Sequence, residues 1–265
     1  MIAFVLKQAD DKLLATLLFQ KCKDFKVYLP AEDHLTADYE GKISLVNGRL
    51  QDVAEPLVCL LEPGAVPDRD FVRRVLRSTR RHPDFNVYHV NQPLAEPWPR
   101  KLKGDKLFKR HIQEGLKAPL SSFVFRTPVL MERAVFRADS SLDVLATVLA
   151  CSKDKPIRNV WHQKLQWLAP QVEQTPELQE KRVRNTLEFF RWTEQFYQDD
   201  TTYPFSVAER MEMIAKEVVK LYPAHTPEQL REEMLSFKVS QGPIRKVRAS
   251  TALKNALKER QQSLM

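Results

Sequence analysis

Residues 57–84 read LVCLLEPGAVPDRDFVRRVLRSTRRHPD, and this stretch decides the fold class of the 265-residue chain. Its first five residues, Leu57 to Leu61, form an apolar run of strand length, which is typical of a strand buried on both faces. Asp68 can cap a helix that follows, and Pro83 lies just past the end of that helix. The buried face of this helix would carry Phe71, Val72, Val75 and Leu76. The stretch therefore predicts a buried strand, a turn and a helix.

Strand-like apolar runs alternate with helical patterns on both sides of this stretch. The expected strands are 2–6, 25–29, 42–46, 57–61, 86–90 and 121–125. Such alternation predicts an α/β fold, with a mainly parallel sheet flanked by helices. Ligands of these sheets bind at the carboxyl ends of the strands. Glu62, directly after the strand at 57–61, therefore lies at the edge of the expected site.

The pattern changes to long helices after Pro170. Two pairs of residues have the capping-box spacing that opens a helix: Ser206 with Glu209, and Thr226 with Gln229. We therefore expect an α/β domain at residues 1–170 and a helical C-terminal extension of three or four helices at residues 171–265.

The formal net charge of +8 is concentrated in two segments, a predicted loop at 100–110 and the tail at 238–260. Such segments suit phosphate-bearing or anionic partners, or they form solvated faces. The tail ends in an expected helix that can lie on an anionic membrane surface. Aromatic residues do not interleave with its charges, so we expect no nucleic-acid partner.

Three cysteines, Cys22, Cys59 and Cys151, are odd in number and far apart, which is typical of reduced thiols in a cytoplasmic protein. No run of about 18 apolar residues predicts a membrane-spanning helix. The chain has only six glycines, which is few for a glycine-rich phosphate-binding loop. We therefore expect a cytoplasmic protein that at most touches a membrane from one side.

Two stretches resemble the family 2 nucleotide-sugar glycosyltransferases, which have the GT-A fold. In that family an apolar strand runs into an acidic motif and then a turn, a proline and a helix, as residues 57–84 do. Residues 118–150, APLSSFVFRTPVLMERAVFRADSSLDVLATVLA, resemble the acceptor-side segment of the family. The resemblance covers about residues 1–165.

This resemblance implies transfer of a sugar from a nucleoside diphosphate sugar to a polysaccharide or glycolipid acceptor, with inversion. The Asp-x-Asp metal motif of the family aligns on residues 62–64. Only Glu62 offers an oxygen ligand there, so the motif is degenerate for the divalent metal, Mn²⁺ or Mg²⁺. The catalytic base aligns with Asp143, with Asp139 as the competing position. Asp143 is equally a helix-capping residue.

The resemblance also implies where the donor binds. Gln8 follows the first strand, and Asp33, which follows the second, resembles the carboxylate that bonds the nucleobase or ribose, although it can equally be a solvated acid. We hypothesise that cations of the segment 100–110, among them Lys101 and Lys103, stabilise the diphosphate in place of a metal or hold a phosphorylated lipid acceptor. Because Gly64 replaces a ligand, the alternative is a catalytically inactive relative that serves as a binding or scaffold protein.

Overall fold

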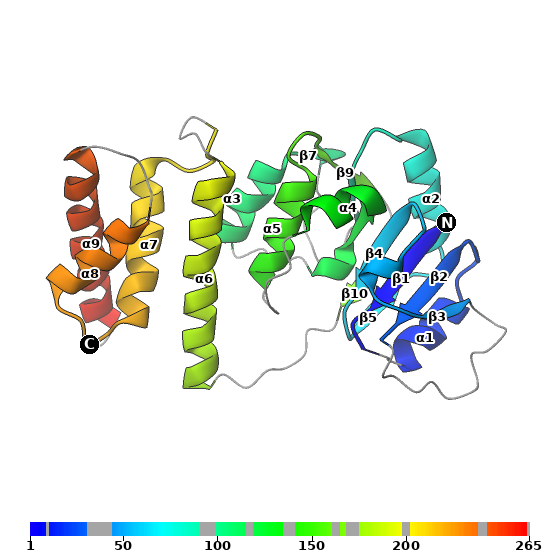
Figure 1. Cartoon of the computed structure of the whole chain (residues 1–265), viewed down its shortest axis with the longest axis horizontal. Helices are drawn as coiled ribbons and strands as arrows, with labels where there is room; N and C mark the ends of the chain where they lie inside the picture. The colour runs from blue at the N-terminus through cyan, green and yellow to red at the C-terminus, as the bar shows by residue number, and fades with distance from the viewer. Residues whose placement is uncertain are drawn as a thin grey trace. The chain divides into compact units, whose positions relative to one another are not determined.

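The computed structural model describes residues 1–8, 11–30, 44–90, 99–114, 119–134, 141–160, 165–167, 175–197, 202–237 and 243–263. The chain divides into two compact units, Met1–Gln171 and Val172–Met265. Figure 1 shows the sheet in the first unit and long helices in the second.

Within the described residues, the first unit is built on a mixed sheet of eight strands. In chain order these strands are β1 (Ile2–Leu6), β2 (Phe25–Leu29), β3 (Leu45–Asn47), β4 (Leu57–Leu61), β6 (Val87–Val90), β7 (Lys101–Leu102), β8 (Phe123–Arg126) and β9 (Ile157–Val160). Their order across the sheet is β3-β2-β1-β4-β8-β6-β9-β7. Strands β7 and β8 run antiparallel to their neighbours, and the others run parallel to one another. The prediction of a mainly parallel α/β sheet is therefore confirmed. Two short strands, β5 (Ala65–Pro67) and β10 (Leu165–Trp167), pair separately.

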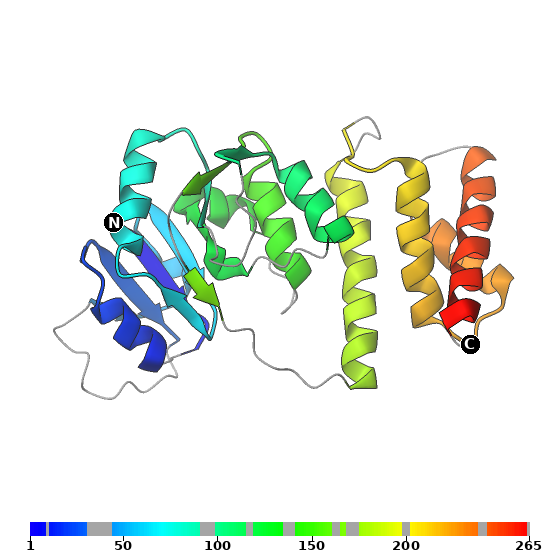
Figure 2. The same cartoon turned by 180° about the vertical axis from the view of Figure 1, so that it is seen from behind.

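Helices cover both faces of this sheet. In chain order they are α1 (Asp11–Leu18), α2 (Phe71–Arg81), α3 (Gly104–Glu114), α4 (Thr127–Arg133) and α5 (Ser141–Cys151). Figure 2 shows α1 and α2 on one side of the sheet, and Figure 1 shows α4 and α5 on the other. The ring of Phe4 on β1 lies 5.5 Å from that of Phe25 and 5.8 Å from that of Phe71, which fixes the sheet against α2.

The start of α2 is held by a buried side chain from the end of α1. The amide of Gln20 donates to the carbonyl of Asp68 at 2.7 Å and accepts from the backbone nitrogen of Val72 at 3.2 Å. The four predicted apolar residues of α2 are all buried. Each contributes about 1.5–3 kcal/mol by burial. The helix therefore turns its apolar side to the sheet and its arginines to solvent.

The basic segment 100–110, predicted as a loop, is a strand and a helix instead. Lys101 and Leu102 form β7, and α3 begins at Gly104. Leu107 and Phe108 of α3 are buried, although charged residues outnumber them. A Cβ atom at Gly104 would lie 2.7 Å from the hydroxyl oxygen of Ser152, so glycine allows this close approach. The sequence pattern did not predict this helix because its two buried apolar residues stand among many charged ones.

The second unit contains four helices within the described residues: α6 (Pro176–Phe196), α7 (Val207–Leu221), α8 (Pro227–Ser236) and α9 (Pro243–Ser263). Both predicted capping boxes, at Ser206 and Thr226, are formed. A buried ion pair joins Arg210 to Glu194 at 2.7 Å. None of the described helices is both long and apolar enough to cross a bilayer.

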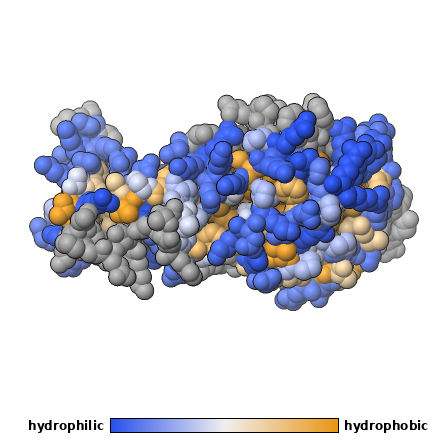
Figure 3. Space-filling view, turned by 90° about the horizontal axis from the view of Figure 1, so that it is seen from above, coloured by the Kyte–Doolittle hydropathy of each residue, from blue (hydrophilic) through white to orange (hydrophobic). Residues whose placement is uncertain are grey.

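The apolar side of α9 is used inside the second unit. Ala249, Ala252, Leu253 and Ala256 are buried, and α9 packs along α7. A membrane contact of this helix would therefore rest on its charges and not on an inserted apolar face. In the space-filling view of Figure 3, hydrophilic residues dominate the visible face of the first unit, with small hydrophobic areas between them.

Candidate functional site

The carboxyl ends of β1 and β4 lie side by side at one edge of the sheet. Leu6 pairs with Leu61, and the backbone nitrogen of Lys7 donates to the carbonyl of Leu61 at 3.4 Å. The register therefore places Lys7 beside Glu62, and Gln8 is exposed just beyond. We call Lys7, Gln8, Glu62 and Ser121 the rim site.

Glu62 is half-buried and turned toward the start of β8. Its Oε2 atom lies 3.5 Å from both the backbone nitrogen and the hydroxyl oxygen of Ser121. Ser121 is fully buried in the 3-10 turn Leu120–Ser122 that precedes β8. Distances of 3.5 Å are at the outer limit of hydrogen bonding. The carboxylate is thus weakly held and free to take a stronger partner.

The thiol of Cys59 lies beneath this contact. Its sulfur is 3.6 Å from the carbonyl oxygen of Ser121, and the residue is completely buried. Burial, and next the charge of Glu62, raise the pKa of the Cys59 thiol far above its ordinary value. The thiol therefore stays neutral and supplies no nucleophile to the rim site.

The turn after β4 has a backbone that favours glycine at position 64. The backbone nitrogen of Ala65 bonds to the carbonyl of Glu62 at 3.1 Å, and Gly64 has φ of 82° in the left-handed region. Glycine takes this conformation without strain, whereas a residue with a Cβ atom does not. Among residues with a Cβ atom, aspartate and asparagine tolerate this region best, so the turn favours glycine at position 64 without excluding a carboxylate.

The next two acidic residues along the chain, Asp68 and Asp70, already have hydrogen-bond or ion-pair partners. Asp68 accepts a hydrogen bond from the backbone nitrogen of Asp70 at 2.8 Å. Asp70 lies at the start of α2, but its carboxylate pairs with Lys21 at 3.1 Å and Arg73 at 2.8 Å. The hydrogen bond from Lys21 is the largest influence that lowers the pKa of Asp70. Within the described residues, no group of three or more potential ligands gathers to hold a metal. These residues alone do not fit a divalent metal site.

Asp143 lies in the first turn of α5. Residues 152–156 join the end of α5 to the start of β9, and β9 runs parallel to β6. The first turn of α5 therefore points toward the edge where the parallel strands end, which is the edge of the rim site. Asp33 and the competing Asp139 lie outside the described residues.

Lys101 and Lys103 are not brought to Glu62. In the register of β7 on β9, Lys101 lies opposite Arg158. Four strand spacings separate β7 from β4 in the sheet. At about 4.8 Å per spacing, the lateral separation of Lys101 from Glu62 is roughly 20 Å. One diphosphate cannot reach both positions.

Comparison with known proteins identifies the fold. No sequence model of a known family matches the chain, and no curated protein sequence matches it. Two crystal structures of TarS residues 1–349 from S. aureus are similar in fold. The complex with UDP has a TM-score of 0.55 at 10% identity, and the complex with UDP-GlcNAc has a TM-score of 0.54 at 11% identity. Each similarity covers 99% of this chain and 91% of the TarS chain. The α/β fold is GT-A-like.

In the GT-A-like unit, the sequence interpretation missed two residues of the rim site. Lys7 follows the first strand directly, and the register of β1 on β4 would have placed it beside Glu62. Ser121 belongs to the run of small residues before β8. A cation, a carboxylate, an exposed amide and a backbone N–H thus meet at the carboxyl edge of a parallel sheet, which is the usual location of a phosphate-bearing ligand.

Proposed function

We propose that the chain is a nucleotide-sugar glycosyltransferase that transfers a sugar, with inversion, to a polysaccharide or lipid-linked glycan acceptor. The observation that carries this proposal is that Gln8 and Glu62 follow the adjacent parallel strands β1 and β4 at the carboxyl edge of a GT-A-like sheet. The TarS structures of similar fold contain UDP and UDP-GlcNAc, which supports a uridine diphosphate sugar as the first donor to test.

The proposal gives each residue a chemical task. Gln8 and Asp33 contact the nucleoside, and Glu62 lies near the diphosphate. Lys7, next to Glu62, offsets charge that develops on the departing diphosphate. The acceptor hydroxyl oxygen forms a bond to the anomeric carbon while the bond from that carbon to the diphosphate oxygen breaks. Asp143 takes the hydroxyl proton as general base.

A divalent metal, Mn²⁺ or Mg²⁺, would have one described protein ligand, Glu62. Mg²⁺ can bind through one carboxylate when substrate phosphates and water complete its shell. Because the described residues do not form a metal site by themselves, the proposed reaction includes no step through a metal. Lys101 and Lys103 are left out of the donor site because of their distance from Glu62.

A second candidate is a catalytically inactive binding or scaffold protein with the same fold. The observation that favours it is the left-handed Gly64 in place of a second acidic residue. Such a protein would keep the sheet and the rim but release no nucleotide from a sugar donor.

A panel of thermal unfolding experiments separates the two candidates. The full chain is mixed with UDP, GDP and dTDP sugars, each with Mn²⁺ and with a chelator. If the chain is a glycosyltransferase, we expect one class of nucleotide sugar to raise the unfolding temperature. We also expect that donor, mixed in excess with acceptor glycans, to be cleaved with release of its nucleotide. Stabilisation without release under any acceptor condition favours the binding protein. No shift with any nucleotide contradicts the glycosyltransferase and favours a scaffold protein that binds no nucleotide.

A further inference from the structure

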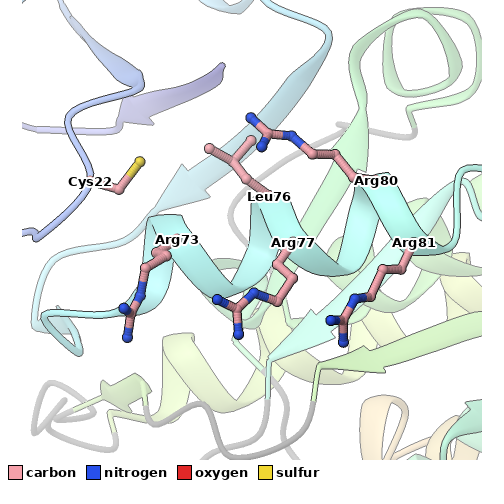
Figure 4. A pocket seen from close by; sticks show the side chains of 6 residues that line it. All are labelled: Cys22, Arg73, Leu76, Arg77, Arg80 and Arg81. Atoms are coloured by element: carbon pink, nitrogen blue, oxygen red, sulfur yellow. The ribbon is translucent and has the colours of Figure 1, made fainter.

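The solvent side of α2 carries an unusual concentration of positive charge. Five of its eleven residues are arginines. Figure 4 shows Arg73, Arg77 and Arg81 projecting on the same side of the helix, one turn apart. Arg80 projects on the other side of the helix, as Leu76 does. These side chains line a groove of about 320 Å³ together with Cys22 and Leu76. The groove is therefore cationic with a small apolar floor.

Carboxylates neutralise only part of this row. Asp70 pairs with Arg73 at 2.8 Å and lies 4.0 Å from Arg74, and Asp24 lies 3.9 Å from Arg80. Within the part of the chain that the structure describes, Arg77 and Arg81 have no carboxylate partner. Both side chains are exposed. These two guanidinium groups, four residues apart, are thus uncompensated on one side of the helix.

Beyond the end of this row, Arg158 of β9 contacts His82, the residue that follows Arg81. Arg158 donates to the ring nitrogen of His82 at 2.8 Å, and its guanidinium carbon lies 5.9 Å from the ring centre of Phe85. Its Nε atom is buried and has no hydrogen-bond partner among the residues that the structure describes. Lys101 also lies over Phe85, at 5.6 Å. The aromatic ring stabilises both cations without neutralising them.

The pKa of His82 is affected by the positive charges around it. The pKa of His82 lies below its ordinary value, first because of burial and then because of the charges of Arg158, Lys101 and Arg81. Because a guanidinium can only donate, the ring nitrogen of His82 accepts the hydrogen bond from Arg158. An anion placed among these cations would relieve their mutual repulsion.

We propose that Arg77 and Arg81 bind a phosphate group, carried by a free phosphate ester or by a lipid headgroup. Guanidinium groups bind phosphate oxygens in pairs through parallel N–H donors. A spacing of four residues separates Arg77 and Arg81 by about 6 Å along the helix, which lets both reach one phosphate. The end of α2 precedes β6, so this site lies toward the amino ends of the parallel strands, opposite to the rim site. It is independent of the proposed donor site.

The test compares the full-length wild type with Arg77→Gln/Arg81→Gln. The matched control, Arg182→Gln/Arg184→Gln, removes two exposed arginines of α6 and lowers the net charge equally. Calorimetry with inorganic phosphate measures the free source, and sedimentation with vesicles of 30% phosphatidylglycerol in phosphatidylcholine measures the lipid source. We expect at least tenfold weaker binding for the α2 variant and less than twofold for the control. Arg77→Lys/Arg81→Lys, which keeps the charge but not the paired donors, should lie between them.

Binding of inorganic phosphate with this pattern assigns the site to free phosphate esters, and binding of vesicles alone assigns it to lipid headgroups. The proposal is overturned if the wild type binds neither, or if the control loses as much affinity as the α2 variant. UDP binding, measured on the same samples, should be unchanged in the α2 variant, so this test is separate from that of the rim site.

Discussion

The carboxylate of Glu62 and the hydroxyl of Ser121 lie 3.5 Å apart, although 59 positions separate them in the chain. The contact forms because β4 ends where the antiparallel strand β8 begins. It joins the two segments that carry the sequence resemblance, residues 57–84 and residues 118–150. The rim site is thus assembled by strand pairing and not by sequence proximity.

Replacing Glu62 should impair sugar transfer. Hydrogen bonds of catalytic groups are often long in ligand-free structures and shorten in the reactive complex. We expect Glu62→Ala to lower the rate of nucleotide release at least tenfold, about 1.4 kcal/mol, with Glu62→Gln between it and the wild type. The control is Glu132→Ala, because Glu132 on α4 is 70% exposed. A Glu62→Ala enzyme within twofold of the wild type would remove Glu62 from the mechanism.

Asp143 should act as more than a helix-capping charge. We expect Asp143→Asn to lower nucleotide release a hundredfold or more, since a positioned general base contributes a factor of about 10²–10⁴. Asp105 provides the matched control, because it also lies in the first turn of a helix, α3. Asp105→Asn loses the same interaction with the helix dipole. Equal losses of activity in the two variants would identify Asp143 as a structural residue.

Gly64 should be required by the backbone of its turn. With φ of 82°, Gly64→Ala should lower the free energy of unfolding by about 1–2 kcal/mol. Gly64→Asn should cost less, because asparagine tolerates the left-handed region better than alanine. Urea unfolding followed by circular dichroism measures both. An alanine variant as stable as the wild type would show that the turn carries no such strain.

Glu55 should make the first unit sensitive to acid. Its carboxylate accepts from the Tyr28 hydroxyl at 2.7 Å and pairs with Lys26 at 2.8 Å. Burial, the largest influence, acts to raise the pKa of Glu55, but the hydrogen bonds from Lys26 and Tyr28 together lower it below the ordinary value. A lowered folded-state pKa gives stability that is present above the unfolded pKa of about 4.3. This stability is lost as pH falls through the folded-state pKa.

Glu55→Gln should therefore be less stable than the wild type at pH 7, by about 1.5–3 kcal/mol for a lost hydrogen bond to a charged group. The difference should shrink below about pH 4. Urea unfolding at pH 7, 5, 4 and 3.5 gives both values, with Glu132→Gln as the exposed control. A difference that stays constant down to pH 3.5 would exclude the ionised form of Glu55 as its source.

The sequence predicted the part of the fold in which local patterns agree with tertiary structure. The apolar runs at β1, β2 and β4 are long, and they form adjacent parallel strands as expected. At α3 the sequence interpretation was wrong, because two buried residues, Leu107 and Phe108, are surrounded by charge. A short buried face of this kind is recognised only when its partner is known, here α5 near Ser152.

The sequence could predict the site residues that come just after a strand. It could not predict those whose neighbours depend on how two strands pair. Gln8 lies two residues after β1 and Glu62 lies directly after β4, so the rule for parallel sheets places both at the same edge. Lys7 requires the pairing of Leu6 with Leu61, which the sequence does not give. Lys101 looked suitable by charge alone, yet the strand order puts it roughly 20 Å from Glu62. The basic side chains of α2 escaped notice because the helix was interpreted by its apolar face.

Hydrogen–deuterium exchange with and without UDP tests the rim site most directly, because it locates the nucleotide on the chain. We predict that saturating UDP slows amide exchange in segments that contain Lys7, Glu62 and Ser121, and leaves the end of α2 at Arg81 unchanged. Protection confined to other segments, or no protection by any nucleoside diphosphate, would contradict a nucleotide site at the carboxyl edge of β1 and β4.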